Sequence, residues 1–273
     1  MIILNGEQLE FKTFPNGETL VNGEQILEYA SDNNTVEFKY ENDGDLIKLL
    51  FVKNFLADHR HKASLIVYYM PYSRMDRVEG SSVFTLKYVA NFINGMNFDR
   101  VTVIEPHSDV TMALVDRSSA KYLSIELLDR VIRETGFNPA EDYLFFPDAG
   151  AQKRYSKVKG YKQLVGFKVR DFQTGEIRKL DVVGSVDKPG FKAIIVDDLC
   201  SYGGTFLLSA ERLKEIGASE IYLLVGHCEK SIFQGKIPQS KILDRVFTTD
   251  TLLDETDTPK IHIYKIGGMQ HDE

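Results

Sequence analysis

The chain has 273 residues, a length that suits one large domain or two compact ones of about 100–150 residues. Hydrophobic residues make up 43% and charged residues 27%, a balance that supports a buried core and argues against disorder. The formal net charge of -7 argues against a general nucleic-acid binder. The longest clean apolar stretch, residues 65–70, is far shorter than the roughly 20 residues needed to span a bilayer.

The start of the chain carries no basic segment typical of a signal peptide, and two cysteines are too few for a disulfide framework. We therefore expect a cytoplasmic protein that does not bind a membrane. Cys200 and Cys228 lie next to apolar segments, so we interpret them as ordinary buried thiols.

The hydrophobic pattern predicts strands that alternate with helices. Asn22 and Gly23 form a dipeptide typical of a hairpin turn, in a β-rich start. In chain order we then expect a helix over 45–61, a strand over 65–70, a helix over 84–96, a strand over 100–105, a helix over 125–134, a strand over 143–146, a helix over 149–157, a strand over 192–197, a helix over 205–216, a strand over 220–225 and a strand over 262–266. This repetition predicts an α/β fold with a mostly parallel sheet, in two similar units that meet near residues 118–124.

The strongest local signal lies between the predicted strand at 192–197 and the helix that follows. Asp197 and Asp198 can accept hydrogen bonds from the vicinal hydroxyls of a sugar. Gly203 and Gly204 let backbone N–H groups approach an anion at a helix N-terminus, where Thr205 adds a hydroxyl. A plain strand-to-helix turn with solvated acids is the alternative, and the spacing favours a sugar-phosphate site.

This loop resembles the ribose-phosphate loop of the type I phosphoribosyltransferase fold. Further segments resemble, in the same order, those of ribose-phosphate diphosphokinases, also called PRPP synthetases. They read Phe-Pro-Asn-Gly-Glu at 14–18, Pro-Tyr-Ser-Arg-Met-Asp-Arg at 71–77, Glu-Pro-His-Ser-Asp at 105–109, Pro-Asp-Ala-Gly-Ala-Gln-Lys-Arg at 147–154 and Phe-Lys-Val-Arg at 167–170. Each is weak alone, but their order over nearly the whole chain is specific.

The resemblance implies two tandem phosphoribosyltransferase-type domains, each a mostly parallel sheet flanked by helices. Residues 1–121 would form an N-terminal ATP-binding domain, and residues 122–273 a C-terminal ribose-phosphate-binding domain. The implied ATP-binding residues are Phe14, Asn16, Glu18, Arg74, Asp76, Arg77 and His107. Judged from its residues alone, the segment at 14–18 is better interpreted as the edge of a hairpin than as a purine-binding segment. Met75 replaces the family's usual glutamine.

The resemblance also implies a Mg²⁺ ion, bound with ATP and held by His107 and Asp148. Lys168 and Arg170 precede a polar stretch at 171–179 that suits a lid over phosphates, although a hairpin with solvated charges is the alternative. The resemblance makes both of them catalytic together with Asp198. The implied reaction transfers the β,γ-diphosphoryl group of MgATP to the anomeric hydroxyl of a ribose 5-phosphoryl acceptor, and AMP leaves.

The acceptor site would comprise Asp197, Asp198, Ser201, Tyr202, Gly203, Gly204 and Thr205. Family members usually read Asp-Thr-x-Gly-Thr in this loop, so Ser201 replaces an acid and bulky Tyr202 replaces a small hydroxyl donor. Both changes should weaken binding of a bare phosphate. They suggest the hypothesis that the acceptor is a 5-substituted ribose such as ADP-ribose, used in NAD salvage, instead of ribose 5-phosphate.

The resemblance further implies small-molecule partners and a homodimer or higher homo-oligomer, because the family's adenine site is often completed by a neighbouring subunit. The chain is short against the family pattern at both ends, so we expect its opening strand–helix unit and its closing helix to be absent.

Two other classes of protein fit parts of the pattern. A non-catalytic regulatory homologue of PRPP synthetase would tend to lose metal and lid residues, which are present here. A phosphoribosyltransferase that consumes PRPP would need one fold unit and no ATP-binding segment. Release of AMP from ATP distinguishes the diphosphokinase from both.

Overall fold

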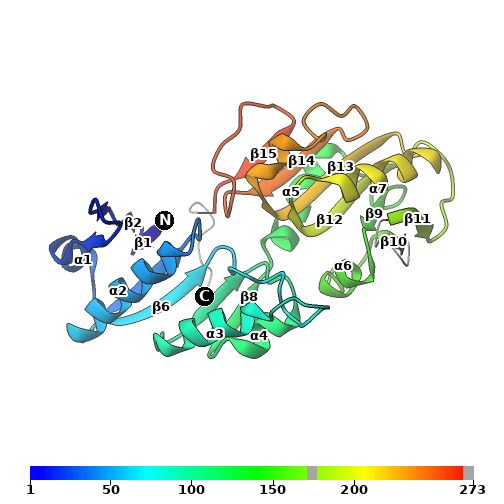
Figure 1. Ribbon diagram of the computed structural model, residues 1–273. Coiled ribbons are helices and arrows are strands. Elements are labelled where there is room, and N and C mark those ends of the chain that lie inside the picture. The colour runs from blue at the N-terminus through cyan, green and yellow to red at the C-terminus, as the bar shows by residue number, and fades with distance from the viewer. Residues whose placement is uncertain (171–176, 267–273) are drawn as a thin grey trace. The chain divides into compact units, whose positions relative to one another are not determined.

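The computed structural model describes residues 1–170 and 177–266, and the side chains of 168–170 and 177–179 are outside this description. The chain divides into two compact units, Met1–Tyr122 and Leu123–Glu273, next to the boundary expected from the sequence. Figure 1 labels their elements. No helix in the described ranges is long and apolar enough to cross a bilayer.

In the described part of the first unit, six strands form one sheet in the order β2-β1-β5-β6-β7-β8. Their bounds are β1 (Ile2–Leu4), β2 (Glu7–Gln8), β5 (Asn33–Phe38), β6 (Lys62–Val67), β7 (Val101–Ile104) and β8 (Ser118–Lys121). The strands from β5 to β8 are parallel, and β1 is antiparallel to both of its neighbours. The helices that follow these strands are α2 (Gly44–Asp58), α3 (Thr85–Gly95) and α4 (Asp109–Leu114).

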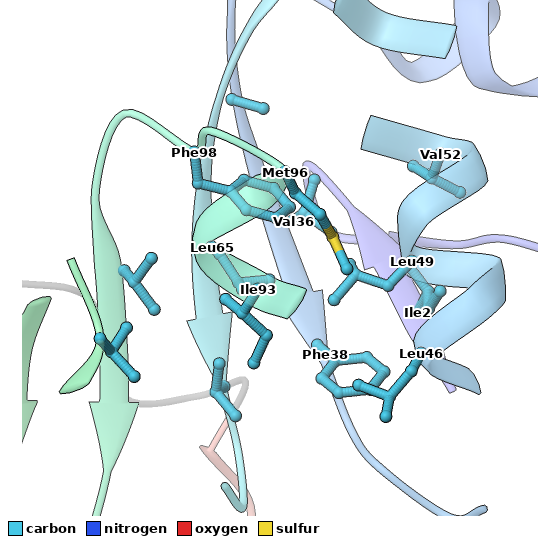
Figure 2. Packing of buried hydrophobic residues seen from close by; sticks show 14 of the residues in the cluster. Ile2, Val36, Phe38, Leu46, Leu49, Val52, Leu65, Ile93, Met96 and Phe98 are labelled. Atoms are coloured by element: carbon cyan, nitrogen blue, oxygen red, sulfur yellow. The ribbon is translucent and has the colours of Figure 1, made fainter. Parts of the chain in front are cut away.

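One apolar cluster joins this sheet to α2 and α3. Val36 and Phe38 face the same side of β5, because alternate residues of a strand share a face. Leu46 and Leu49 of α2 lie three residues apart on one helical stripe and pack against them. Figure 2 shows these side chains meeting Ile93 of α3, and all of them are at most 8% exposed. The α/β arrangement of the first unit therefore has a continuous core.

The N-terminal segment corrects one prediction. The hairpin consists of β3 (Phe11–Thr13) and β4 (Thr19–Val21), and its turn places Gly17 at φ 91°. Asn22 instead caps α1 (Gly23–Tyr29): its Oδ1 accepts hydrogen bonds from the backbone N–H groups of the second and third helical residues, at 3.1 and 3.4 Å. The predicted hairpin turn at 22–23 is wrong because asparagine caps helices as readily as it forms turns.

In the described part of the second unit, seven strands form a sheet in the order β11-β10-β9-β12-β13-β14-β15. Their bounds are β9 (Tyr143–Phe146), β10 (Lys162–Arg170), β11 (Ile177–Val183), β12 (Lys192–Cys200), β13 (Glu220–Cys228), β14 (Arg245–Thr249) and β15 (Ile261–Tyr264). Neighbouring strands are parallel except β10 and β11, which are antiparallel. The helices are α5 (Leu123–Thr135), α6 (Ala149–Arg154), α7 (Gly204–Glu215) and the short 3₁₀ helix η1 (Lys230–Gln234).

Helices cover both faces of this second sheet. Tyr143 and Phe145 of β9 belong to the apolar cluster that includes α7, whereas Leu144 and Phe146 belong to the cluster that includes α5 and α6. Every residue of β9 is buried, as expected for a parallel strand covered on both faces. The helices and strands predicted from the pattern are confirmed with shifted ends; β12 and β13 continue to Cys200 and Cys228, beyond the predicted ends at 197 and 225.

Candidate functional site

The loop from β12 to α7 lies at the carboxyl edge of the second sheet, where an open α/β sheet presents its ligand sites. Gly203 has φ 83°, in the left-handed region, and it is the residue before α7. A Cβ at this position would overlap Cδ1 of Ile237 and lie 2.7 Å from its Cγ1. At Gly204, by contrast, no described atom lies within 4 Å of the corresponding position. A side chain at Gly204 would therefore extend into open space, and the backbone N–H groups at the start of α7 are the donors with which this end of the helix could bind an anion.

The two acids that end the predicted strand share one cation. Nη1 of Arg154 lies 3.1 Å from Oδ1 of Asp197 and 2.9 Å from Oδ1 of Asp198. The three side chains are between 8% and 17% exposed. Burial and the adjacent carboxylate of Asp198 raise the pKa of Asp197 well above its usual range, while Arg154 acts in the opposite direction. The structure therefore brings together the two predicted sugar-binding acids and adds an arginine to them.

Sequence reasoning assigned no role to Arg154. It ends the 147–154 segment, and its separation from Asp197 by 43 positions gave no local sign of the pairing. The available signal was a cation at the C-terminus of α6, which follows β9, the strand directly beside β12.

The other loop residues differ in exposure. The Tyr202 side chain is 58% exposed. The hydroxyl of Ser201 lies 3.0 Å from that of Ser231, and Thr205 is half-buried in the first turn of α7. The loop therefore has an exposed aromatic ring at 202, a serine hydroxyl within hydrogen-bond distance of Ser231, and a half-buried threonine in the first turn of the helix.

Asp148 follows β9 at the same edge of the sheet. Its Oδ1 accepts a hydrogen bond of 3.0 Å from the backbone N–H of Ala151 and so caps α6. The carboxylate thus has a structural partner, which fixes its position at the carboxyl end of the strand.

The predicted catalytic cations lie on the antiparallel pair β10–β11. The register pairs Lys168 with Leu180 and Arg170 with Ile177, with an irregularity between residues 169 and 170. The side chains of Lys168 and Arg170 and the lid residues 171–176 lie outside the described residues. The structure thus places these two positions on a strand, and their catalytic role stays a prediction.

In the first unit, the predicted purine-binding segment forms the turn of the β3–β4 hairpin. The backbone N–H of Phe14 donates to the carbonyl of Glu18 at 2.8 Å. Nδ2 of Asn16 donates to Oε2 of Glu18 at 2.9 Å, and Phe14 is 49% exposed. The hairpin turn therefore carries an exposed ring and a hydrogen-bonded amide and carboxylate, residue types that can stack on a purine and hydrogen-bond its edge.

The remaining ATP-binding candidates follow two neighbouring parallel strands. Arg74, Asp76 and Arg77 follow β6, and His107 follows β7, so both loops lie at the same edge of the first sheet. Arg77 is 74% exposed, and its Nε lies 3.9 Å from Oδ1 of Asp76. Glu105, between β7 and His107, is 2% exposed and adopts φ 43°, a left-handed conformation that turns the chain sharply at this edge.

The metal candidates belong to different units, His107 to the first and Asp148 to the second. Within the residues that the structure describes, no group of three or more His, Cys, Asp or Glu side chains could hold a metal ion. Each unit thus contributes one candidate ligand, an imidazole in the first and a capping carboxylate in the second. Mg²⁺ keeps several waters and binds through one or two carboxylates and substrate phosphates, so the carboxylate of Asp148 fits an ion brought in with a nucleotide.

Comparison with known proteins agrees with this architecture. A family model described as the phosphoribosyl synthetase-associated domain matches residues 153–270. The ribose-phosphate pyrophosphokinase of Pyrococcus abyssi is 27% identical over 270 residues, which cover 95% of this chain and 90% of that protein. The ribose-phosphate pyrophosphokinase of Sulfolobus acidocaldarius is 29% identical over 270 residues, with coverage of 95% and 89%.

A solved structure shares the fold. The crystal structure of phosphoribosylpyrophosphate synthetase from Mycobacterium smegmatis matches with a TM-score of 0.75 at 20% identity, over 96% of this chain and 87% of that one. The two relatives match over most of their own length. The family model, these relatives and the shared fold therefore support the ribose-phosphate pyrophosphokinase, or PRPP synthetase, family of transferases for this chain, with a phosphoribosyltransferase-type fold.

Proposed function

We propose that this protein transfers the β,γ-diphosphoryl group of MgATP to the 1-hydroxyl of ribose 5-phosphate and releases AMP. The observation that carries the proposal is the loop at the carboxyl edge of the second sheet. There a carboxylate pair at 197–198 precedes a loop whose open glycine, Gly204, begins α7. Relatives named ribose-phosphate pyrophosphokinases, which align with most of this chain, support the proposal.

The second unit is proposed to bind the acceptor. Asp197 and Asp198 accept hydrogen bonds from the 2- and 3-hydroxyls of the ribose. Arg154 opposes protonation of Asp197, so it favours the ionised form that accepts two hydroxyl protons. The 5-phosphate lies at the N-terminus of α7, where backbone N–H groups and the hydroxyl of Thr205 donate to its oxygens.

The first unit is proposed to bind the nucleotide. Phe14 stacks on the adenine, and the hydrogen-bonded pair Asn16 and Glu18 contacts its polar edge. Arg74 and Arg77 follow β6 and offer cations to the phosphates, with Asp76 and His107 at the same sheet edge.

In the proposed reaction the 1-hydroxyl oxygen of ribose attacks the β-phosphorus of ATP. A bond forms between that oxygen and the β-phosphorus, and the bond from the β-phosphorus to the oxygen bridging the α-phosphorus breaks. AMP leaves with the bridging oxygen, and the hydroxyl proton passes to solvent. Lys168 and Arg170 neutralise charge on the transferring group, which is the main protein contribution to phosphoryl transfer. His107 of the first unit and Asp148 of the second are the candidate ligands for Mg²⁺, which when bound would further neutralise the phosphate charge.

The test is a direct assay for AMP. Purified protein is incubated with MgATP and ribose 5-phosphate, and the nucleotide products are separated. We expect AMP and a ribosyl 1-diphosphate in equal amounts. Formation of ADP, or no product, would contradict the proposal.

A variant pair tests the catalytic lysine. Lys168→Ala should lower kcat by about 10²–10³-fold with little change in ATP binding, as for a group that acts on the transition state. Lys157→Ala removes an exposed lysine outside the proposed site and serves as the matched control. Equal rates for the two variants would remove Lys168 from the mechanism.

One observation favours a second acceptor. The ring of Tyr202 is 58% exposed on the loop proposed to hold the 5-phosphate, so it is available to pack against a larger 5-substituent such as the nucleotide part of ADP-ribose. The assay is repeated with ADP-ribose in place of ribose 5-phosphate and compared by kcat/KM. Far faster turnover of ribose 5-phosphate would reject ADP-ribose as the acceptor.

A further inference from the structure

A segment outside the predicted site packs directly on the loop proposed to bind phosphate. It follows β13 and comprises Glu229, η1 and residues 235–237. We infer that this segment, called here the 229–237 brace, positions the loop at 200–205, and that Gly235 and Ser231 are positioning residues for the 5-phosphate site. The inference rests on the proposed function for the identity of the ligand alone; the brace itself follows from contacts within the second unit.

The closest contact joins two backbones. A Cβ at Gly235 would overlap the carbonyl oxygen of Tyr202 and lie 2.9 Å from its carbonyl carbon. Gly235 adopts φ -84° and ψ -175°, a conformation open to any residue. The need for glycine here therefore comes from close approach and not from backbone strain. Any side chain at 235 must displace the Tyr202 peptide or the brace.

A second contact supports the turn into α7. Ile237 is fully buried, and its side chain occupies the space that a Cβ at Gly203 would need. Gly203 has φ 83°, so it provides both the left-handed turn and the room for Ile237. The brace thus packs against two consecutive loop residues, 202 and 203.

Hydrogen bonds also join the brace to the loop. The hydroxyl of Ser231 donates to Oε2 of Glu229 at 3.0 Å, and it lies 3.0 Å from the hydroxyl of Ser201. Because a carboxylate oxygen accepts and a serine hydroxyl carries one hydrogen, the hydrogen of Ser231 is used on Glu229, and Ser201 can act as the donor to Ser231. The backbone N–H of Glu229 donates to the carbonyl of Cys200 at 2.8 Å. The brace therefore contacts every loop residue from 200 to 203.

These hydrogen bonds assign Ser201 a role other than the phosphate binding that the sequence predicted. Its hydroxyl can donate its one hydrogen to Ser231, so we assign it to support of the loop and not to binding of the phosphate. Phosphate recognition falls to the backbone N–H groups at the start of α7 and to Thr205, and their placement depends on the brace. Ser201 is accordingly a positioning residue.

Two variants test the brace. Gly235→Ala inserts one methyl group against the Tyr202 carbonyl, and Ser231→Ala removes the link to Ser201. Backbone amide exchange of the peptide that covers 200–205 is measured by mass spectrometry, together with KM for each substrate. We expect exchange to rise about tenfold in Gly235→Ala, and KM for ribose 5-phosphate to rise about three- to tenfold in each variant, with KM for ATP within about twofold.

Matched variants control for the substitutions. Gly95→Ala adds the same methyl group in the first unit, where no described atom lies within 4 Å of it, and should behave as wild type. Ser231→Thr keeps the hydroxyl and should retain most of the wild-type exchange and KM. If Gly235→Ala fails to fold, the contrast between Ser231→Ala and Ser231→Thr decides the question.

The outcomes separate the two proposals. If wild-type protein releases no AMP from ATP and ribose 5-phosphate, the proposed function fails, while exchange of the 200–205 peptide still reports on the brace. Unchanged exchange in the folded variants, or an equal rise of KM for both substrates, would overturn the brace.

Discussion

Arg154 is the residue whose removal gives the sharpest test of the acid pair. Its guanidinium contacts Asp197 at 3.1 Å and Asp198 at 2.9 Å, and it is 12% exposed. Arg154→Gln keeps much of the side chain but removes the charge, which leaves two adjacent carboxylates without this counter-ion.

Breaking a buried ion pair from one side costs about 3–5 kcal/mol, because an uncompensated charge stays buried. Protonation of Asp197 relieves part of this cost, so we expect a loss of about 3 kcal/mol in the free energy of unfolding at pH 8. A loss of that size lowers the melting temperature of a unit of this length by about 6–12 °C.

The pH dependence has a definite sign. The folded pKa of Asp197 is raised above the unfolded value near 3.9, so the folded state binds this proton more tightly. Stability from this group is present below the unfolded pKa and is lost as pH rises through the folded pKa. Removal of Arg154 raises the folded pKa further. The difference in stability between variant and wild type should therefore be larger at pH 8 than at pH 5.

The assay is urea unfolding at both pH values, followed by the fluorescence of the 13 tyrosines in a chain without tryptophan. Arg133→Gln, at an exposed arginine of α5, is the control and should stay within about 0.5 kcal/mol of wild type. A loss below about 0.5 kcal/mol for Arg154→Gln at pH 8, or a larger loss at pH 5, would refute the reasoning.

Two further outcomes are expected. The pKa of the Cys200 thiol is raised by its hydrogen bond with Cys228 and by burial. Native protein at pH 7 should therefore resist a thiol reagent, whereas denatured protein should react at both cysteines. Rapid labelling of the native protein would contradict this prediction. Phe14→Ala should raise KM for ATP about tenfold. Leu20 is another exposed apolar residue of the hairpin, and Leu20→Ala should leave KM for ATP unchanged. Similar effects of the two variants would indicate general disruption of the hairpin.

Local patterns predicted most of the second unit. The apolar runs at 143–146, 192–197 and 220–225 became β9, β12 and β13, because a strand buried on both faces needs apolar residues at successive positions. The buried state of both cysteines was also predicted and is confirmed. The strand β5, with the sequence Asn-Asn-Thr-Val-Glu-Phe, was missed, because it contains only two apolar residues and begins with two asparagines, which are uncommon in strands.

The hairpin turn predicted at Asn22 was wrong because the local sequence does not distinguish a turn from the start of a helix. An Asn-Gly pair suits a tight turn and a helix start equally well, and the choice depends on what packs nearby. Here a Cβ at Gly23 would lie 2.7 Å from the ring of Phe55 in α2, so close packing of α1 on α2 decides the position. That information is not local to the dipeptide.

The sequence by itself determined the α/β order and the acid–glycine loop, because both arise from residues that are adjacent in the chain. The tertiary structure decided which distant residues complete that loop: Arg154 beside Asp197, and Gly235 beside Tyr202. Both pairings depend on how parallel strands align, since β9 and β13 flank β12 and bring the segments that follow them to one edge. Periodicity identifies each strand but not its neighbours in the sheet, and the neighbours set the geometry of the site.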